Sequence, residues 1–319
     1  MSLSRYAARR LVLLVATLFG ASVITFVLTN VLPGDVAVMI LGTRADSEQI
    51  EILRQQLGLN RPLYVQYLDW IAGVIQGDLG VSLRFGDPVA TLLAQRLPAS
   101  AFLAFTALTI AVVLAIPLGV VAAIEQNTWK DFLTSVGAFT GISLPNFFWG
   151  MVLILLLARY VPLLPPSGYV SPLEDPPDAF AHVLLPAGAL GFSLMAHLTR
   201  MTRSSLIEEL RSGYVELARM KGLTSRRIVY RHALRNAFLP VLTVIGFQLG
   251  YLFGGIIVIE QLFSYPGLGR LAFNALINRD VPLIQGSVLT IAVIFMTSNL
   301  VVDLLYAVLD PRVSTGGGE

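Results

Sequence analysis

Six long apolar stretches alternate with polar segments along the 319 residues of the chain. The apolar stretches cover about residues 11–32, 99–124, 132–160, 181–199, 238–259 and 284–309. A helix needs about 20 apolar residues to cross the hydrocarbon core of a bilayer, and lipid offers no partner for a free backbone N–H or C=O group. The pattern therefore predicts an all-α, polytopic membrane protein with six transmembrane helices.

Composition supports the same class of protein. Hydrophobic residues make up 55% of the chain and charged residues only 13%, whereas a soluble domain carries about 25% charged residues. The first apolar stretch is longer than the roughly 7–15-residue apolar core of a secretory signal, so we expect it to remain as a span. The absence of cysteine excludes disulfides and thiolate metal sites.

Basic residues gather on one predicted side of the membrane. Arg5, Arg9 and Arg10 precede the first stretch, and nine of the 22 Lys and Arg residues lie between Arg200 and Arg235. Because loops rich in Lys and Arg stay in the cytoplasm, we expect both termini and the segment 200–237 to be cytoplasmic.

The segment between the first two spans, about residues 33–97, is predicted to lie outside. DSEQIEILRQQLG and RPLYVQYLDWIAGVI each have the spacing of an amphipathic helix. These helices either pack on the membrane surface or form an outer platform for a partner or for substrate entry. The chain is thus divided into residues 1–97, the first span with its outer loop, and residues 98–319, a five-helix core that contains the loop at about 200–237.

The basic segment RSGYVELARMKGLTSRRIVYRHALR predicts two helices joined at Gly222, which can adopt the left-handed conformation that ends a helix. On the second helix a basic stripe is expected at Arg227, Arg231 and Arg235. The stripe could face anionic lipid headgroups. Alternatively, the first helix docks into a groove of a partner through an exposed apolar set, namely Tyr214, Val215, Ala218 and Met220.

ELARMKG resembles the EAA loop of the membrane subunits of bacterial ABC importers. Glu216, Ala218 and Gly222 match that pattern, and Leu217 replaces its middle alanine. The resemblance extends to LPGD, LGLNRPLYVQYLDWI, QGDLGVSL, RHALRNAFLPV, YPGLGRL, NRDVPLIQG and NLVVDLLYAVLDPR. Together these segments are similar to the permeases of the dipeptide and oligopeptide ABC importer family, in particular to the permease type with the long outer loop.

The resemblance implies a type I importer permease in the bacterial inner membrane, with several partners. These are a second homologous permease, two cytoplasmic ATPase subunits that bind ATP and Mg²⁺, and an extracytoplasmic substrate-binding protein. The family carries short peptides, and some members carry glutathione or nickel complexes. The basic segment would be the coupling helix, with ATPase-coupling residues Tyr214, Glu216, Ala218, Arg219, Lys221 and Gly222.

The chain itself is not expected to be an enzyme. It contains no GxxxxGK[ST] phosphate loop, no GxSxG elbow and no HExxH pair, so we expect no catalytic residue and no bound metal or cofactor. Nothing in it suggests a nucleic-acid partner. A proton-coupled secondary transporter is the rival class, but it requires inverted repeats and a carboxylate relay, and neither is found.

Polar and small residues inside the spans are candidates for a substrate path. Ionisable groups are costly within a bilayer, so Glu260 is considered for the outer mouth, and Asp303 for a structural pair with an arginine of the basic segment. Four-residue spacing of glycines allows close helix contact, either within the chain or beside the path of a partner permease. The candidate path residues are Gly246, Gln248, Gly250, Gly254 and Glu260. Pro117 and Pro145 can bend the second and third spans.

Overall fold

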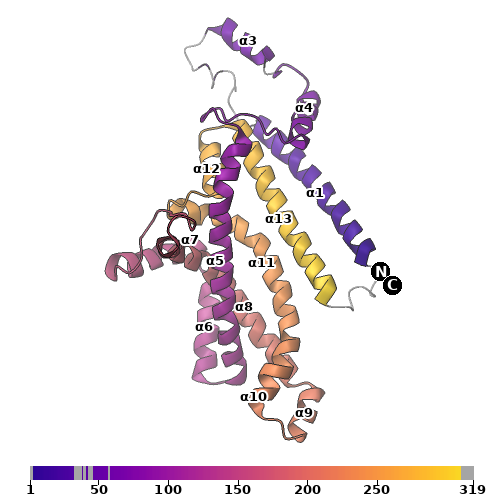
Figure 1. Ribbon diagram of the computed structural model, residues 1–319, viewed down its shortest axis with the longest axis vertical. Coiled ribbons are helices and arrows are strands. Elements are labelled where there is room, and N and C mark those ends of the chain that lie inside the picture. Colours follow the sequence, from indigo (N-terminus) through magenta and orange to yellow (C-terminus); the bar gives the residue numbers. More distant parts are fainter. Residues whose placement is uncertain (1–2, 32–37, 39–40, 42–45, 57, 310–319) are drawn as a thin grey trace.

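The computed structural model describes residues 3–31, 38, 41, 46–56 and 58–309. The LPGD segment and the carboxy-terminal tail from Asp310 lie outside the described residues. Helices make up almost the whole described structure (Figure 1). They are α1 (Leu3–Val31), α3 (Ser47–Gln56), α4 (Leu63–Ile75), α5 (Val89–Ile124), α6 (Trp129–Ser143), α7 (Asn146–Leu153), the π-helix η1 (Ile154–Tyr160), α8 (Pro176–Leu210), α9 (Gly213–Met220), α10 (Ser225–Arg227), the π-helix η2 (Ile228–Ala233), α11 (Leu234–Leu262), α12 (Leu268–Ile277) and α13 (Val281–Leu309).

All six apolar stretches are helical. Among the described residues, four helices are long and apolar enough to cross a membrane, namely α1, α5, α8 and α13, and α6 with α7 and η1 makes a fifth if counted as one span. That third stretch is bent by 111° at Pro145, which supplies no N–H to the α6 carbonyls. Helix α11 has 29 residues, but the side chains of Leu249–Tyr251 and Phe253 are outside the described set, and α11 is not counted among these spans. The count of six spans therefore stays a prediction.

Helices α5, α8 and α11 form the centre of the bundle and share its largest apolar core. Small residues allow α5 and α8 to approach closely. A Cβ atom added to Gly191 of α8 would lie 2.8 Å from the carbonyl oxygen of Ala107, and one added to Gly119 of α5 would lie 2.6 Å from Cβ of Thr202. Close backbone approach of this kind is how helices pack inside a bilayer.

Helix α1 lies at the edge of the bundle beside α13 (Figure 1). Near one end of the pair, Nε2 of Gln285 donates a hydrogen bond to Oγ1 of Thr29 at 2.8 Å. Near the other end, Arg10 pairs with Asp303 at 3.0 Å. The structural pairing predicted for Asp303 is therefore confirmed, but its partner is Arg10 and not an arginine of the basic segment, because the end of α13 runs beside the beginning of α1.

Helix α4 packs its aromatic side chains on α1. The hydroxyl groups of Tyr67 and Ser22 form a hydrogen bond of 2.8 Å. The centroid of the Phe26 ring lies 5.4 Å from that of Tyr67 and 5.7 Å from that of Trp70. Tyr64 and Leu68 of the same helix are exposed.

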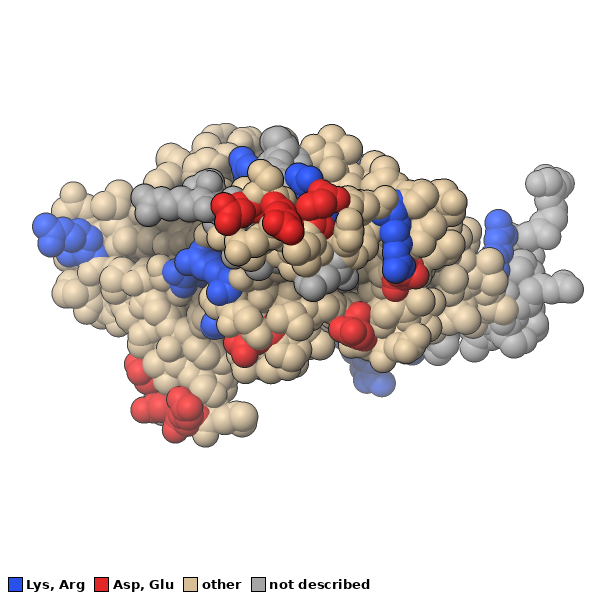
Figure 2. All heavy atoms as spheres, turned by 90° about the horizontal axis from the view of Figure 1, so that it is seen from above, with Lys and Arg blue, Asp and Glu red and all other residues tan. Residues whose placement is uncertain are grey.

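A second core lies at the end of the molecule that carries α4 and α12. It joins the start of α5 to α12 and α13 through Val89, Leu92, Leu93, Leu268, Leu271, Ala275, Leu283 and Ile284. Ser82 donates a hydrogen bond of 2.5 Å to Asp280, which ties the segment before α5 to the turn before α13. The boundary predicted at residues 97 and 98 thus falls inside α5. Seen from this end, charged side chains form small, separate groups on a mostly uncharged surface (Figure 2).

Candidate functional site

The predicted glycine elbow is present at the end of the bundle opposite α12 (Figure 1). Helix α8 continues to Leu210, so the first part of the expected loop is helical. Helix α9 then ends at Met220, and Gly222, two residues further on, has a left-handed φ of 76°. The N–H of Leu223 donates to the carbonyl of Ala218 at 3.2 Å, which satisfies an end carbonyl of the helix. Gly222 therefore ends α9 as the sequence predicts.

One face of α9 is buried against the bundle. Val215 is only 1% exposed, and Ala218 packs beside it. The core below them contains residues of α5, α8, η2 and α11, namely Val120, Ala123, Leu206, Ile228, Val229, Ala233 and Ala237. The prediction that Val215 is exposed is therefore wrong, and Ala218 is half-buried, because this core covers the face on which both residues lie.

The opposite face of α9 is apolar and exposed. Leu217 is 59% exposed and Met220 74% exposed, and the charged side chains of Glu216, Arg219 and Lys221 flank them. Sequence reasoning missed Leu217, although a large leucine in place of the middle alanine of the EAA pattern was visible in the sequence. A short helix with one face in the core and a second apolar face open to the surface is suited to helix-in-groove binding.

The Tyr214 hydroxyl fixes the start of α9. It donates a hydrogen bond to the Glu209 carboxylate at the end of α8 and accepts one from Nδ2 of Asn236 at 3.1 Å. Partial burial and the hydrogen bond to Glu209 both raise the pKa of Tyr214. This tyrosine thus links α8, α9 and α11.

The second half of the elbow differs from the prediction. Helix α10 ends at Arg227, a π-helical turn follows, and α11 begins at Leu234 and continues through Pro240. Arg227, Arg231 and Arg235 are all exposed. The π-turn between them replaces the regular α-helical spacing that defined the predicted stripe. A hollow of about 390 Å³ is lined by Thr224, Arg226, Arg227 and Tyr230.

Arg203 of α8, which precedes the basic segment, joins two helices. Nε of Arg203 in α8 donates to the Asp131 carboxylate in α6 at 2.6 Å, and its NH2 group donates at 2.8 Å. The Asp131 carboxylate also accepts a hydrogen bond from the backbone N–H of Asn127 at 3.0 Å. This paired geometry orients a guanidinium and a carboxylate strongly, and it fixes the end of α6 to α8.

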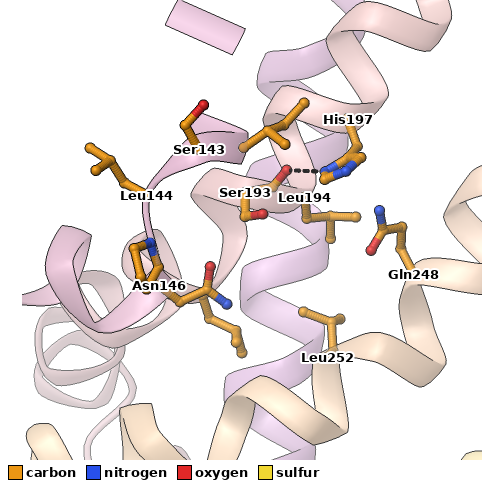
Figure 3. A pocket seen from close by; sticks show the side chains of 11 residues that line it. Ser143, Leu144, Asn146, Ser193, Leu194, His197, Gln248 and Leu252 are labelled. Carbon is orange, nitrogen blue, oxygen red and sulfur yellow. Dashed lines mark hydrogen bonds between the residues drawn. The ribbon is translucent and has the colours of Figure 1, made fainter. Parts of the chain in front are cut away.

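A pocket of about 620 Å³ lies in the middle of the bundle, at the break between α6 and α7 (Figure 3). Ser193 and Gln248, which line it, are the middle residues of α8 and α11. Asn146 of α7 and Gln248 extend into the pocket from opposite walls (Figure 3). Nδ1 of His197 donates to the carbonyl oxygen of Ser193 at 2.9 Å.

The remaining candidate path residues lie elsewhere. A Cβ atom on Gly246 would overlap Val302, so Gly246 serves packing on α13, whereas a Cβ atom on Gly254 would meet nothing within 4 Å. The surroundings of Gly250 are outside the described set. Of the four candidates whose surroundings are described, the structure brings only Gln248 to the pocket. Asn146 and Ser193, which sequence reasoning missed, line the pocket with it.

Glu260 does not line an open mouth in this structure, because its side chain is completely buried. Oγ of Ser100 donates to its carboxylate at 2.6 Å, and the backbone N–H of Arg270 donates at 2.8 Å. The carboxylate therefore joins α5, α11 and α12. Among the described residues, no three His, Asp or Glu side chains lie close enough together to hold a metal ion.

Comparison with known proteins places this architecture in a family. Residues 115–315 match the family described as "Binding-protein-dependent transport system inner membrane component", and residues 3–104 match its amino-terminal companion. The chain is 41% identical over 308 residues to the glutathione transport system permease protein GsiC of Escherichia coli O6:H1, with 97% of this chain and 98% of the relative covered. It is 42% identical over 334 residues to the dipeptide transport system permease protein DppB of Escherichia coli K12, with the same coverage. The chain belongs to the inner membrane components of binding-protein-dependent transport systems, the permease subunits of ABC importers.

Proposed function

We propose that the chain is a permease subunit that moves short peptides across the inner membrane into the cytoplasm. Two relatives of similar length are named for glutathione and dipeptide transport, and both of these substrates contain peptide bonds. The importer would comprise this chain, a second homologous permease, two ATPase subunits that bind ATP and Mg²⁺, and an extracytoplasmic binding protein. The basic residues around α9 support a cytoplasmic position for the elbow and for both termini.

The two faces of α9 carry this proposal. Val215 is fixed in a core that includes α5, α8 and α11, so a force applied to α9 reaches the helices that surround the mid-bundle pocket. Leu217 and Met220 leave an apolar surface open on the other side. An ATPase groove that closes on this surface when ATP binds would move the bundle as one body.

Site-directed cross-linking tests this assignment directly, because the chain contains no cysteine of its own. Leu217→Cys and Met220→Cys would each carry a photoactivated maleimide, in membranes that contain the complete importer. Leu173→Cys, at a residue that is 96% exposed but lies in the segment before α8, is the matched control. We expect both α9 positions, and not the control, to form adducts with the ATPase subunits. Adducts only with lipid, or equal ATPase adducts from all three positions, would contradict the proposal.

A further inference from the structure

The mid-bundle pocket has a chemical character that the coupling role of α9 does not explain. None of the described residues that line it is Asp, Glu, Lys or Arg. Its walls combine the apolar side chains of Leu144, Leu190, Leu194 and Leu252 with five polar residues, namely Ser143, Asn146, Ser193, His197 and Gln248. A pocket of about 620 Å³ is large enough for a small organic molecule, since such sites measure roughly 300–1,000 Å³.

Two side-chain amides are available to a ligand in this pocket. Among the described residues, no hydrogen bond occupies the side chain of Asn146 or that of Gln248. Each amide offers an N–H donor and a C=O acceptor. Gly255 provides the space beside Asn146, because a Cβ atom there would lie 3.0 Å from its Nδ2 atom. The two amides thus extend into the pocket from different helices (Figure 3).

A peptide group presents the complementary chemistry. It also has one N–H donor and one C=O acceptor, and it must give up hydrogen bonds to water when it enters an apolar space. The amides of Asn146 and Gln248 would replace that water without contacting the substrate's own side chains, which the leucines can surround. Because no Asp, Glu, Lys or Arg side chain lines the pocket, it would bind weakly enough to release a substrate onward.

We propose that this pocket is a peptide-bond-binding subsite within the permease, in which Asn146 and Gln248 hydrogen-bond to the backbone amides of the substrate. The inference rests on the proposed transport of short peptides, and it assigns a recognition role to the permease in addition to that of the external binding protein. It also predicts that recognition depends on the peptide group rather than on the side chains of the substrate.

The experiment measures uptake by the complete importer in proteoliposomes with ATP enclosed. Alanylalanine, trialanine and glutathione are the probes, and the probe that the wild-type importer carries is followed further. Its ester analogue, in which an oxygen replaces the peptide N–H, is measured in parallel. The variants are Gln248→Met and Asn146→Leu. Gln261→Met, the same change at a residue of α11 that does not line the pocket, is the matched control.

We expect each pocket variant to lower kcat/KM for the peptide by roughly three- to tenfold, the effect of losing one neutral hydrogen bond. The preference for the peptide over its ester should decrease by a similar factor, because the ester has already lost the donor. The control should match the wild type. Since the binding protein is the same in every preparation, a change in this preference arises in the permease. A merely structural effect would lower uptake of both compounds equally.

Two other results are informative and differ from each other. If the wild type carries a peptide and both pocket variants keep its rate and its preference, the subsite is refuted while the proposed function stands. If the wild-type importer carries none of the three probes in an ATP-dependent way, the proposed function fails and the subsite fails with it.

Discussion

The ion pair between Asp131 and Arg203 allows a quantitative prediction about the α6–α8 contact. The side chains are 8% and 28% exposed, and two hydrogen bonds of 2.6 and 2.8 Å join them. Two unit charges 4 Å apart attract by about 4 kcal/mol at an effective dielectric constant of 20. Desolvation offsets part of this attraction, so we take the net coupling to be about 1.5–3 kcal/mol, the range for hydrogen bonds to charged groups.

A double-mutant cycle measures this coupling. Asp131→Asn and Arg203→Gln should each destabilise the protein by about 2–4 kcal/mol, because each leaves a largely buried charge without its partner. The double variant should be less destabilised than the sum of the two by the coupling energy. Unfolding of the purified protein in mixed micelles, titrated with SDS and followed by tryptophan fluorescence, gives the four free energies of unfolding.

The neighbouring pair of Lys130 and Glu125 is the control. It is close in space, with an N–O distance of 2.6 Å, but its side chains are 42% and 40% exposed. Exposed pairs contribute about 0–1 kcal/mol, so Lys130→Met should change the free energy of unfolding by less than about 1 kcal/mol. A coupling below about 0.5 kcal/mol for Asp131 and Arg203 would refute the reasoning from burial and paired geometry.

Two further predictions concern the elbow and the bundle. Gly222→Val places a branched side chain at a φ of 76°, which costs about 1–2 kcal/mol. The double variant Gly222→Val with Glu216→Lys should uncouple ATP hydrolysis from uptake. Peptide uptake at the wild-type rate by this double variant would contradict the coupling role. Gly191→Ala should destabilise the protein by about 1–3 kcal/mol through the contact with Ala107. Gly137→Ala is the control and should leave the stability unchanged, because a Cβ atom there meets nothing within 4 Å. The same SDS titration measures both variants.

The helical stretches could be predicted because lipid makes apolar length almost sufficient to define a helix. The position of the break in the third stretch was also predictable, since Pro145 removes a helix hydrogen bond. Its angle of 111° was not, because tertiary packing around α7 and η1 determines it. Gly222 could be identified for a similar reason, as a local conformational requirement of one residue.

Contacts between distant segments could not be predicted. Arg203 and Asp131 are 72 positions apart, and neither residue carries a local signal for the other. Helix α9 has apolar residues on two faces, so only the position of the core shows that Val215 is inside and Leu217 outside. Polar residues near the middle of apolar stretches indicate the lining of the pocket. This criterion identified Gln248, and Asn146 and Ser193 satisfy it as well, but it was not applied to them.

The pairing of α1 with α13 has a consequence for biogenesis. A ribosome makes α1 near the start of translation and α13 near its end. The contacts of Thr29 with α13 and of Asp303 with α1 can therefore form only when the chain is finished. Helix α1 is therefore in the bilayer without its contacts to α13 until that last helix is inserted. A nascent chain that stops before α13 would lack both of these contacts, so α1 would have no partner along this face.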